Sequence, residues 1–193
     1  RTGLLDLDSV YGPSFNNVEV ALNEGDRNNE FKLEFAISPN ISVADADLPR
    51  EEKKPYRARI GDPRNDENLT LLQLHVVFLK AHNRIVRSGR TFEEAKTLLR
   101  RRYQRLVVKD FLPKLVHEED LRAAAGKRNL YQPTNEELFI PIEFTAAAFR
   151  FGHSMIRSNY QFNNARGTVP LRLLFTRSAL GDYYHLLADW VID

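Results

Sequence analysis

The most constraining feature of the sequence is a long apolar helix in its first half. Residues 61–90 begin with a turn that contains Arg64 and Glu67, continue as a helix over about residues 66–87 that is apolar on nearly every side, and end near Gly89. A helix with almost no polar face belongs in the interior of a fold. Arg64 and Glu67, three residues apart, share one face at its start. A charged pair at the mouth of a buried helix is a candidate functional site, because burial and close charges change side-chain chemistry.

Composition sets limits on the class of protein. The 193 residues are 42% apolar and 28% charged, which is ordinary for a globular protein of one domain or part of one. A net charge of +2 gives no case for binding nucleic acid or an anionic membrane. The sequence has no cysteine, and no apolar run reaches the about 18 residues that span a bilayer. The compartment stays open, and we favour a secreted or periplasmic location over the cytoplasm.

Both ends of the sequence interrupt a pattern. The chain begins at Arg1 without a methionine or a signal peptide, and it stops at Asp193, at the end of an amphipathic and helical-looking stretch over residues 179–193. We therefore expect a piece of a longer protein.

Strands are few in the predicted structure. Residues 30–36 alternate between apolar and polar side chains, which predicts one strand. Residues 38–55 contain three prolines and many charges and predict a long loop, with Asp45 and Asp47 at its surface. Residues 171–175 are apolar and predict a short strand or extended run.

Further helices are predicted after the first. Thr91 and Glu94 form a capping box for an amphipathic helix over about residues 92–111, and the arginine run inside it, at residues 100–102, is expected to be solvated. A short helix over residues 116–125 ends at Gly126.

A second nearly all-apolar helix is predicted over about residues 142–158. It contains Arg150 and His153, three residues apart on one face. Three consecutive alanines and Gly152 keep part of this helix thin, so a flat ligand or another backbone can come close.

The histidines do not form a metal-binding pattern. A single histidine on an apolar helix is usually a hydrogen-bonded core residue, and this interpretation applies to His75, His82 and His153 taken singly. His75 and His82 are seven residues apart, whereas a zinc site needs a spacing of three or four and a third ligand.

A short acidic segment near the start is a candidate calcium site. Asp6 and Asp8, with the hydroxyls of Thr2 and Ser9, supply hard oxygen ligands of the kind that Ca²⁺ takes. Alternating acids in a turn are more often simply solvated, so both interpretations stay open at this point.

The two apolar helices together permit one particular chemistry. A neutral imidazole in an apolar wall suits a haem iron as axial ligand, and an arginine one turn before it can pair with a propionate. A second arginine on the opposite side can stabilise charge as a peroxide O–O bond breaks. Composition and spacing alone do not establish a haem site.

Four segments, in order, resemble the animal-type haem peroxidases of the peroxidase–cyclooxygenase superfamily, and most of all its bacterial members. They are TGLLDLDSVYG, RIGDPRNDENLTLLQLHVVFLKAHNRIV, VVKDFLPKLV and EFTAAAFRFGHSMIR, and they extend over nearly the whole chain. They are similar to the calcium loop, the distal-arginine helix, a connecting helix end and the proximal helix. The resemblance implies a mainly α fold with very little β, in which residues 1–193 are part of a single catalytic domain.

The resemblance also implies a role for each matching residue. Arg64 matches the distal catalytic arginine, and Glu67 matches the acid that forms an ester with a haem methyl group. Arg150 matches the arginine that binds a propionate, and His153 matches the proximal iron ligand. The implied cofactors are haem b, with an ester through Glu67 as an open option, and Ca²⁺. The implied calcium ligands are Thr2, the carbonyl of Leu4, Asp6 and Asp8.

Departures from the family pattern refine these expectations. The distal histidine, a second ester-forming acid and one calcium-binding aspartate precede the calcium loop in the family, and the asparagine partner of the proximal histidine follows the last residue here. We expect the remainder of the same peroxidase chain to supply them. Asn68 stands where some mammalian members have a methionine bonded to haem, so we expect no such bond. Arg150 stands where cyclooxygenases have a radical-forming tyrosine, which favours a peroxidase.

We therefore expect a peroxidase that reduces hydrogen peroxide and oxidises halide, thiocyanate or small organic donors. Its expected partners are these small molecules, with no nucleic acid and no transmembrane segment. Two alternatives stay open. One is a fatty-acid dioxygenase on the same scaffold, and the other is a non-catalytic helical module that binds calcium or a partner.

Overall fold

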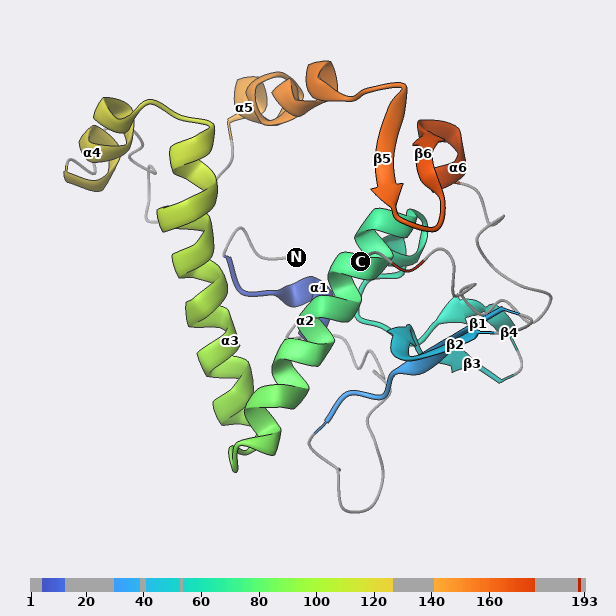
Figure 1. The fold of residues 1–193 in the computed structure, drawn as a ribbon. Coiled ribbons are helices and arrows are strands. Elements are labelled where there is room, and N and C mark those ends of the chain that lie inside the picture. The colour runs from blue at the N-terminus through green and yellow to red at the C-terminus, as the bar shows by residue number, and fades with distance from the viewer. Residues whose placement is uncertain are drawn as a thin grey trace. The chain divides into compact units, whose positions relative to one another are not determined.

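The fold is mainly α-helical, as predicted, with three small antiparallel sheets in the part of the chain that the structure describes (Figure 1). The structure is a computed structural model, and it describes residues 5–12, 30–38, 41–52, 54–126, 141–175 and 191. The chain divides into two compact units. Unit 1 comprises Arg1–Thr2, Asp6–Arg100 and Ser158–Asp193, and unit 2 comprises Gly3–Leu5 and Arg101–Arg157.

Helix α2, Leu69–Arg87, is the longest element of unit 1. It begins three residues later than predicted, because Pro63–Asp66 form a separate 3₁₀ turn and the side chain of Asn68 caps α2 by accepting from the amides of the second and third helical residues. One face of α2 packs into the core, whereas Leu74 on another face is 52% exposed. The expectation of burial on nearly every side is therefore wrong. The buried apolar residues of α2 are Leu69, Leu72, Val76, Leu79 and Ile85.

The region predicted as a long loop, residues 38–55, is largely strand. Strand β1, Glu34–Ser38, pairs with β2, Ile41–Asp47, and β3, Arg50–Glu51, pairs with β4, Lys54–Ala58. The prolines misled the prediction, because Pro49 lies between two strands and Pro55 lies in a two-stranded sheet that consists of edges, and both places tolerate proline. In Figure 1 these four strands lie together beside α2.

A second correction concerns the last part of unit 1. Strands β5, Asn159–Asn163, and β6, Gly167–Pro170, form a hairpin that the sequence did not reveal. The next segment, Leu171–Leu174, is the short helix α6 and not a strand. Its apolar run is too short for periodicity to separate the two. The helix predicted over residues 179–193 lies outside the described residues.

An aromatic cluster joins four segments of unit 1. Tyr11, at the end of helix α1, Asp8–Tyr11, packs with Phe31, His82 and Phe92, with ring centroids 4.7–5.9 Å apart. The hydroxyl of Tyr11 hydrogen-bonds to Nδ1 of His82 at 2.9 Å. Burial raises the pKa of Tyr11, so this hydroxyl stays protonated. His82 is therefore a satisfied core residue, as the sequence suggested.

Helix α3, Phe92–Leu106, starts with the predicted capping box. The amide and hydroxyl of Thr91 donate to a carboxylate oxygen of Glu94, and the Glu94 amide donates back to Thr91 at 3.3 Å. The helix is shorter than predicted, because residues 107–111 form a π-helical segment.

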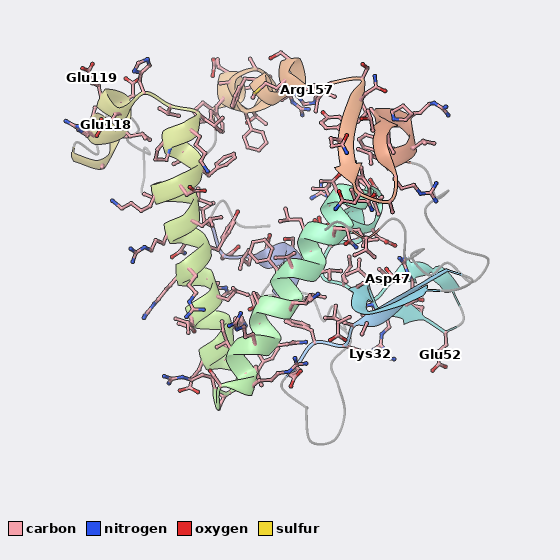
Figure 2. The ribbon with its side chains drawn as sticks, in the orientation of Figure 1. Lys32, Asp47, Glu52, Glu118, Glu119 and Arg157 are labelled. Carbon is pink, nitrogen blue, oxygen red and sulfur yellow. The ribbon has the colours of Figure 1, made fainter. Side chains whose placement is uncertain are left out.

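Unit 2 continues with α4, Glu118–Gly126, from which Glu118 and Glu119 project into solvent (Figure 2). The prediction of one buried helix over residues 142–158 is wrong. The segment consists of α5, Ile142–Ala146, and a 3₁₀ segment, Ala148–Met155. Ala147 separates them, because its backbone (φ −125°, ψ −71°) is not helical. None of the described helices in either unit is long and apolar enough to cross a membrane.

Candidate functional site

The turn before α2 presents an exposed arginine on a buried carboxylate. Asp62, 5% exposed, caps the 3₁₀ turn Pro63–Asp66 by accepting from the amide of Arg64 at 3.1 Å. Its two oxygens also accept from Nε and Nη2 of Arg64, each at 3.2 Å. The Arg64 side chain is 60% exposed, and its other N–H donors can reach a ligand. The described ion-pair partner of Arg64 is therefore Asp62, and Glu67, three residues further on, is exposed.

The inner side of the same turn is tied to the rest of unit 1. The side-chain nitrogen Nδ2 of Asn65 donates to Nδ1 of His75 at 2.8 Å. His75 is 3% exposed, and its Nε2 is buried without a hydrogen-bond partner in the described part of the chain. Burial lowers the pKa of His75 to about 4, against the opposing effect of Asp62, so its ring is neutral at pH 7.

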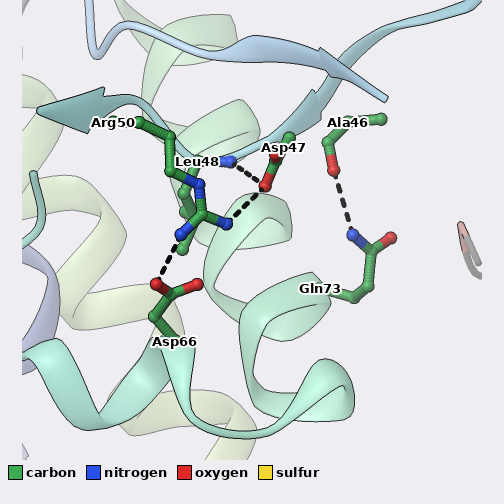
Figure 3. A network of polar contacts seen from close by, with 6 residues as sticks. All are labelled: Ala46, Asp47, Leu48, Arg50, Asp66 and Gln73. Carbon is green, nitrogen blue, oxygen red and sulfur yellow. Dashed lines mark hydrogen bonds and ion pairs between the residues drawn. The ribbon is translucent and has the colours of Figure 1, made fainter. Parts of the chain in front are cut away.

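The next residue of the turn enters a buried ionic cluster (Figure 3). Asp66 accepts from Nη1 of Arg50 at 2.5 Å, and Asp47 accepts from Nη2 at 3.2 Å. Burial acts to lower the pKa of Arg50, but the two carboxylates outweigh it and raise the pKa. Asp47 was expected at the surface, but it is fully buried, because Arg50 balances its charge.

Two glycines bring the first and second sequence motifs together. A Cβ atom added at Gly61 would lie 2.8 Å from the amide nitrogen of Gly12. Gly12 follows α1 with a φ of +80°, in the region that favours glycine. The end of the first motif, at Ser9 and Gly12, therefore packs closely against Gly61, which directly precedes the turn that carries Arg64.

The calcium candidates are only partly described. Asp6 accepts a hydrogen bond from the amide of Asp8 at 3.2 Å, while Thr2 and Leu4 lie outside the described residues. Over the part of the chain that is described, no three histidine or carboxylate side chains are grouped to hold a metal ion. Nε of Arg100 donates to the carbonyl of Asp6 at 2.5 Å, so the expectation that Arg100 is solvated is wrong.

The 3₁₀ segment of unit 2 carries the other two candidate residues. His153 and Arg150 are three residues apart, which eclipses them on one face of a 3₁₀ helix. Nδ1 of His153 lies 2.8 Å from the carbonyl of Arg150, and a carbonyl can only accept. The proton is therefore on Nδ1, and Nε2 keeps the lone pair that a metal needs. Nε of Arg150 donates to the carbonyl of Thr145 at 3.2 Å.

Comparison with known proteins decides the family. The family model described as animal haem peroxidase matches residues 1–186. The chain belongs to the animal haem peroxidase family. It is similar to peroxidase mlt-7 of Caenorhabditis elegans, with 36% identity over 172 residues, 83% of this chain and 23% of that protein. It is also 28% identical to mouse (Mus musculus) thyroid peroxidase over 204 residues, 91% of this chain and 22% of that protein. The chorion peroxidase of Aedes aegypti is 28% identical over 181 residues, 83% of this chain and 22% of that protein. The chain thus spans less than a quarter of the length of these relatives.

The donor set of this haem peroxidase chain suits the family's cofactor. His153 offers an imidazole Nε2 for iron, and Arg150 keeps its terminal nitrogens for a carboxylate because only Nε bonds to Thr145. Arg64 and Glu67 belong to unit 1, whereas Arg150 and His153 belong to unit 2, and the structure describes each pair within its own unit.

Sequence reasoning missed the residues that hold this turn in place. Arg50 and Asp66 had no expected role, and Asp62 was quoted only as part of a motif. The available signal was weak. Asp47 and Arg50 are three residues apart, but charges in a proline-rich stretch are usually solvated. Their pairing depends on β2, β3 and the turn meeting in space.

Proposed function

We propose that the protein carrying this chain is a haem peroxidase that reduces hydrogen peroxide and oxidises halide, thiocyanate or small organic donors. The observation that carries the proposal is the exposed guanidinium of Arg64, held by the buried Asp62 inside the segment that the family model matches. When bound, haem supplies the redox-active iron for this reaction. We propose further that residues 1–193 belong to one catalytic domain, and that the protein is secreted or periplasmic.

Arg64 is the residue of this chain that acts on peroxide. Asp62 occupies Nε and one terminal nitrogen and so fixes the plane of the guanidinium. The side chain is 60% exposed, so its remaining donors would be able to bind a peroxide oxygen. As the O–O bond breaks, negative charge grows on that oxygen, and a guanidinium already in place stabilises it without reorganisation.

His153 and Arg150 are the residues of this chain that would hold the cofactor. His153 would hold the haem iron through Nε2, and the hydrogen bond from Nδ1 to the Arg150 carbonyl fixes the ring tautomer and would raise the basicity of the ligand. The terminal nitrogens of Arg150 pair with a propionate.

Two finer assignments extend the proposal. Glu67 is exposed at the end of the turn, three residues from Arg64, where an ester to haem can form. Thr2, Leu4, Asp6 and Asp8 form the loop part of a calcium site. The alternatives are not favoured, because the named relatives are peroxidases, and Arg150 occupies the position of the oxygenase tyrosine.

Haem reconstitution of the whole protein tests the proposal. The wild type should show a Soret band and peroxide-dependent oxidation of iodide or an organic dye. The His153→Ala variant should lose the Soret band, and His117→Ala, a change at an exposed histidine, should not. Arg64→Gln should keep haem but lose about 100- to 1,000-fold in kcat.

The matched control for Arg64 is Arg90→Gln, which removes an equally exposed arginine of a surface ion pair and should leave turnover unchanged. Haem binding that survives His153→Ala would overturn the assignment of the iron ligand. Oxygen uptake with an unsaturated fatty acid and no added peroxide would instead favour the dioxygenase.

A further inference from the structure

We propose that Arg50 is a positioning residue, which holds the turn bearing Arg64 and Glu67 in its working conformation through Asp66. The proposal rests on the proposed peroxidase function for its catalytic consequence. Its structural part stands on contacts within unit 1 alone.

The first observation is a buried bridge between separate elements (Figure 3). Arg50 lies at the start of β3, Asp47 at the end of β2, and Asp66 at the end of the 3₁₀ turn. Their side chains are 5%, 0% and 12% exposed. One guanidinium uses one terminal nitrogen for each carboxylate. The turn is therefore attached to the strands by a charge-assisted contact that solvent screens little.

The second observation is the place of Asp66 in the turn. It lies two residues after Arg64 and directly before Glu67. Asp62 and Asp66 direct their side chains into unit 1, at 5% residue exposure and 12% side-chain exposure, whereas Arg64 and Glu67 are exposed. In so short a turn a shift of Asp66 carries both exposed residues with it. The inward residues fix the place of the turn and leave the outward residues free to meet ligands.

Electrostatics shows what removal of Arg50 does. The guanidinium separates the carboxylates of Asp47 and Asp66, and without it two negative charges face each other in a buried setting. Removing one partner of a buried ion pair is strongly unfavourable, because each carboxylate loses a positive charge that compensates its own. Asp47 is anchored by its strand and by its bond to the Leu48 amide at 2.7 Å. Asp66, at the end of a four-residue turn, is the one that moves.

Geometry makes arginine specific at this position. The two carboxylates belong to different elements, and a planar fork with two terminal nitrogens reaches both at once. Lysine at position 50 keeps the positive charge but offers a single ammonium group. Arg50→Lys should therefore hold the turn better than Arg50→Gln but less well than the wild type. A role in net charge alone would be restored fully by lysine.

The experiment uses the whole protein and a readout that needs no haem. Amide hydrogen exchange over residues 62–68 should become about tenfold faster or more in Arg50→Gln, with a smaller increase in Arg50→Lys and Asp66→Asn. With haem bound, kcat should fall by about 100-fold in Arg50→Gln while the Soret band stays, because a small misplacement of a reacting group has that cost. The matched control is Arg87→Gln, which removes another arginine from a buried carboxylate, Glu30 (4% exposed).

The outcomes separate the possibilities. Faster exchange confined to the turn in Arg50→Gln, and absent in Arg87→Gln, supports the proposal. Unchanged exchange in the turn, or an increase spread evenly over unit 1, overturns it. If Arg50→Gln does not fold, the same two readings apply to Arg50→Lys and Asp66→Asn. A wild type that takes up no haem refutes the peroxidase function but leaves the exchange result valid.

Discussion

Two segments of this chain each carry two candidate site residues, but they are held in place by different kinds of contact. The turn at residues 62–67 bears Arg64 and Glu67, and the 3₁₀ segment Ala148–Met155 bears Arg150 and His153. In each case the two residues are three positions apart. The turn is held by buried side chains from other elements. The side chains of the 3₁₀ segment are held by hydrogen bonds to backbone carbonyls no more than five residues away.

Burial shows the same contrast on a larger scale. Every buried side chain among the described residues belongs to unit 1, and none to unit 2. In the 3₁₀ segment Phe149 is 70% exposed and Phe151 is 53% exposed. The orientation of Arg64 is therefore a tertiary property, which distant changes can disturb. The tautomer of His153 is a local property, which such changes leave intact.

The largest expected effect is that of acid, which should destabilise unit 1 by protonating the buried His75. Its pKa is about 4 in the fold and 6.5 in the unfolded chain, so the fold favours the neutral ring. That contribution is complete above pH 6.5 and is lost as the pH falls towards 4. The difference of about 2.5 units corresponds to about 3 kcal/mol. Urea unfolding of the wild type, compared at pH 7 and pH 4.5, should show this loss of stability. Amide hydrogen exchange in α2, measured at both pH values, should show it too.

A matched pair of variants isolates the histidine from titrating carboxylates. His75→Gln stays neutral and should lose less stability on acidification than the wild type. His117→Gln, at an exposed position of unit 2, should behave as the wild type does. An identical pH dependence in all three proteins would show that the burial of His75 has no energetic consequence.

A glycine-to-alanine pair compares the two segments directly. At Gly61 the new methyl group would lie 2.8 Å from a backbone nitrogen of Gly12, so the backbone must shift. We expect Gly61→Ala to destabilise unit 1 by about 1–3 kcal/mol, as overpacking does. At Gly152 nothing lies within 4 Å of the added Cβ, so Gly152→Ala should be neutral or stabilising. Denaturant midpoints measure both, and equal destabilisation would contradict the close approach of the two motifs.

The sequence predicted what local rules and family resemblance can carry. The capping box at Thr91 was predicted correctly, because it depends on residues three apart. The strands of residues 41–58 were missed, because proline and charge outweighed a weak alternation. The burial of Asp47 and Arg50 could not be predicted, since no spacing in the sequence indicates a contact between a strand end and a turn. The prediction of a continuous helix around His153 was wrong at Ala147. Alanine favours helix, but the backbone of Ala147 is not helical.

Two local hydrogen bonds between a side chain and the backbone offer the mildest comparison of the two segments. Asn68 accepts from the amides of Thr70 and Leu71 at 2.8 and 3.2 Å, and Asn68→Ala should cost about 1 kcal/mol of stability in α2. In unit 2 the hydroxyl of Thr145, an exposed residue of α5, donates to the carbonyl of Pro141 at 3.1 Å. Thr145→Val should change stability by no more than about 0.5 kcal/mol, because solvent replaces the bond. It should also leave Arg150 in place, since the carbonyl that Arg150 uses is backbone. Thermal unfolding and exchange over residues 145–155 measure both effects, and a larger loss in Thr145→Val than in Asn68→Ala would reverse the contrast between tertiary and local control.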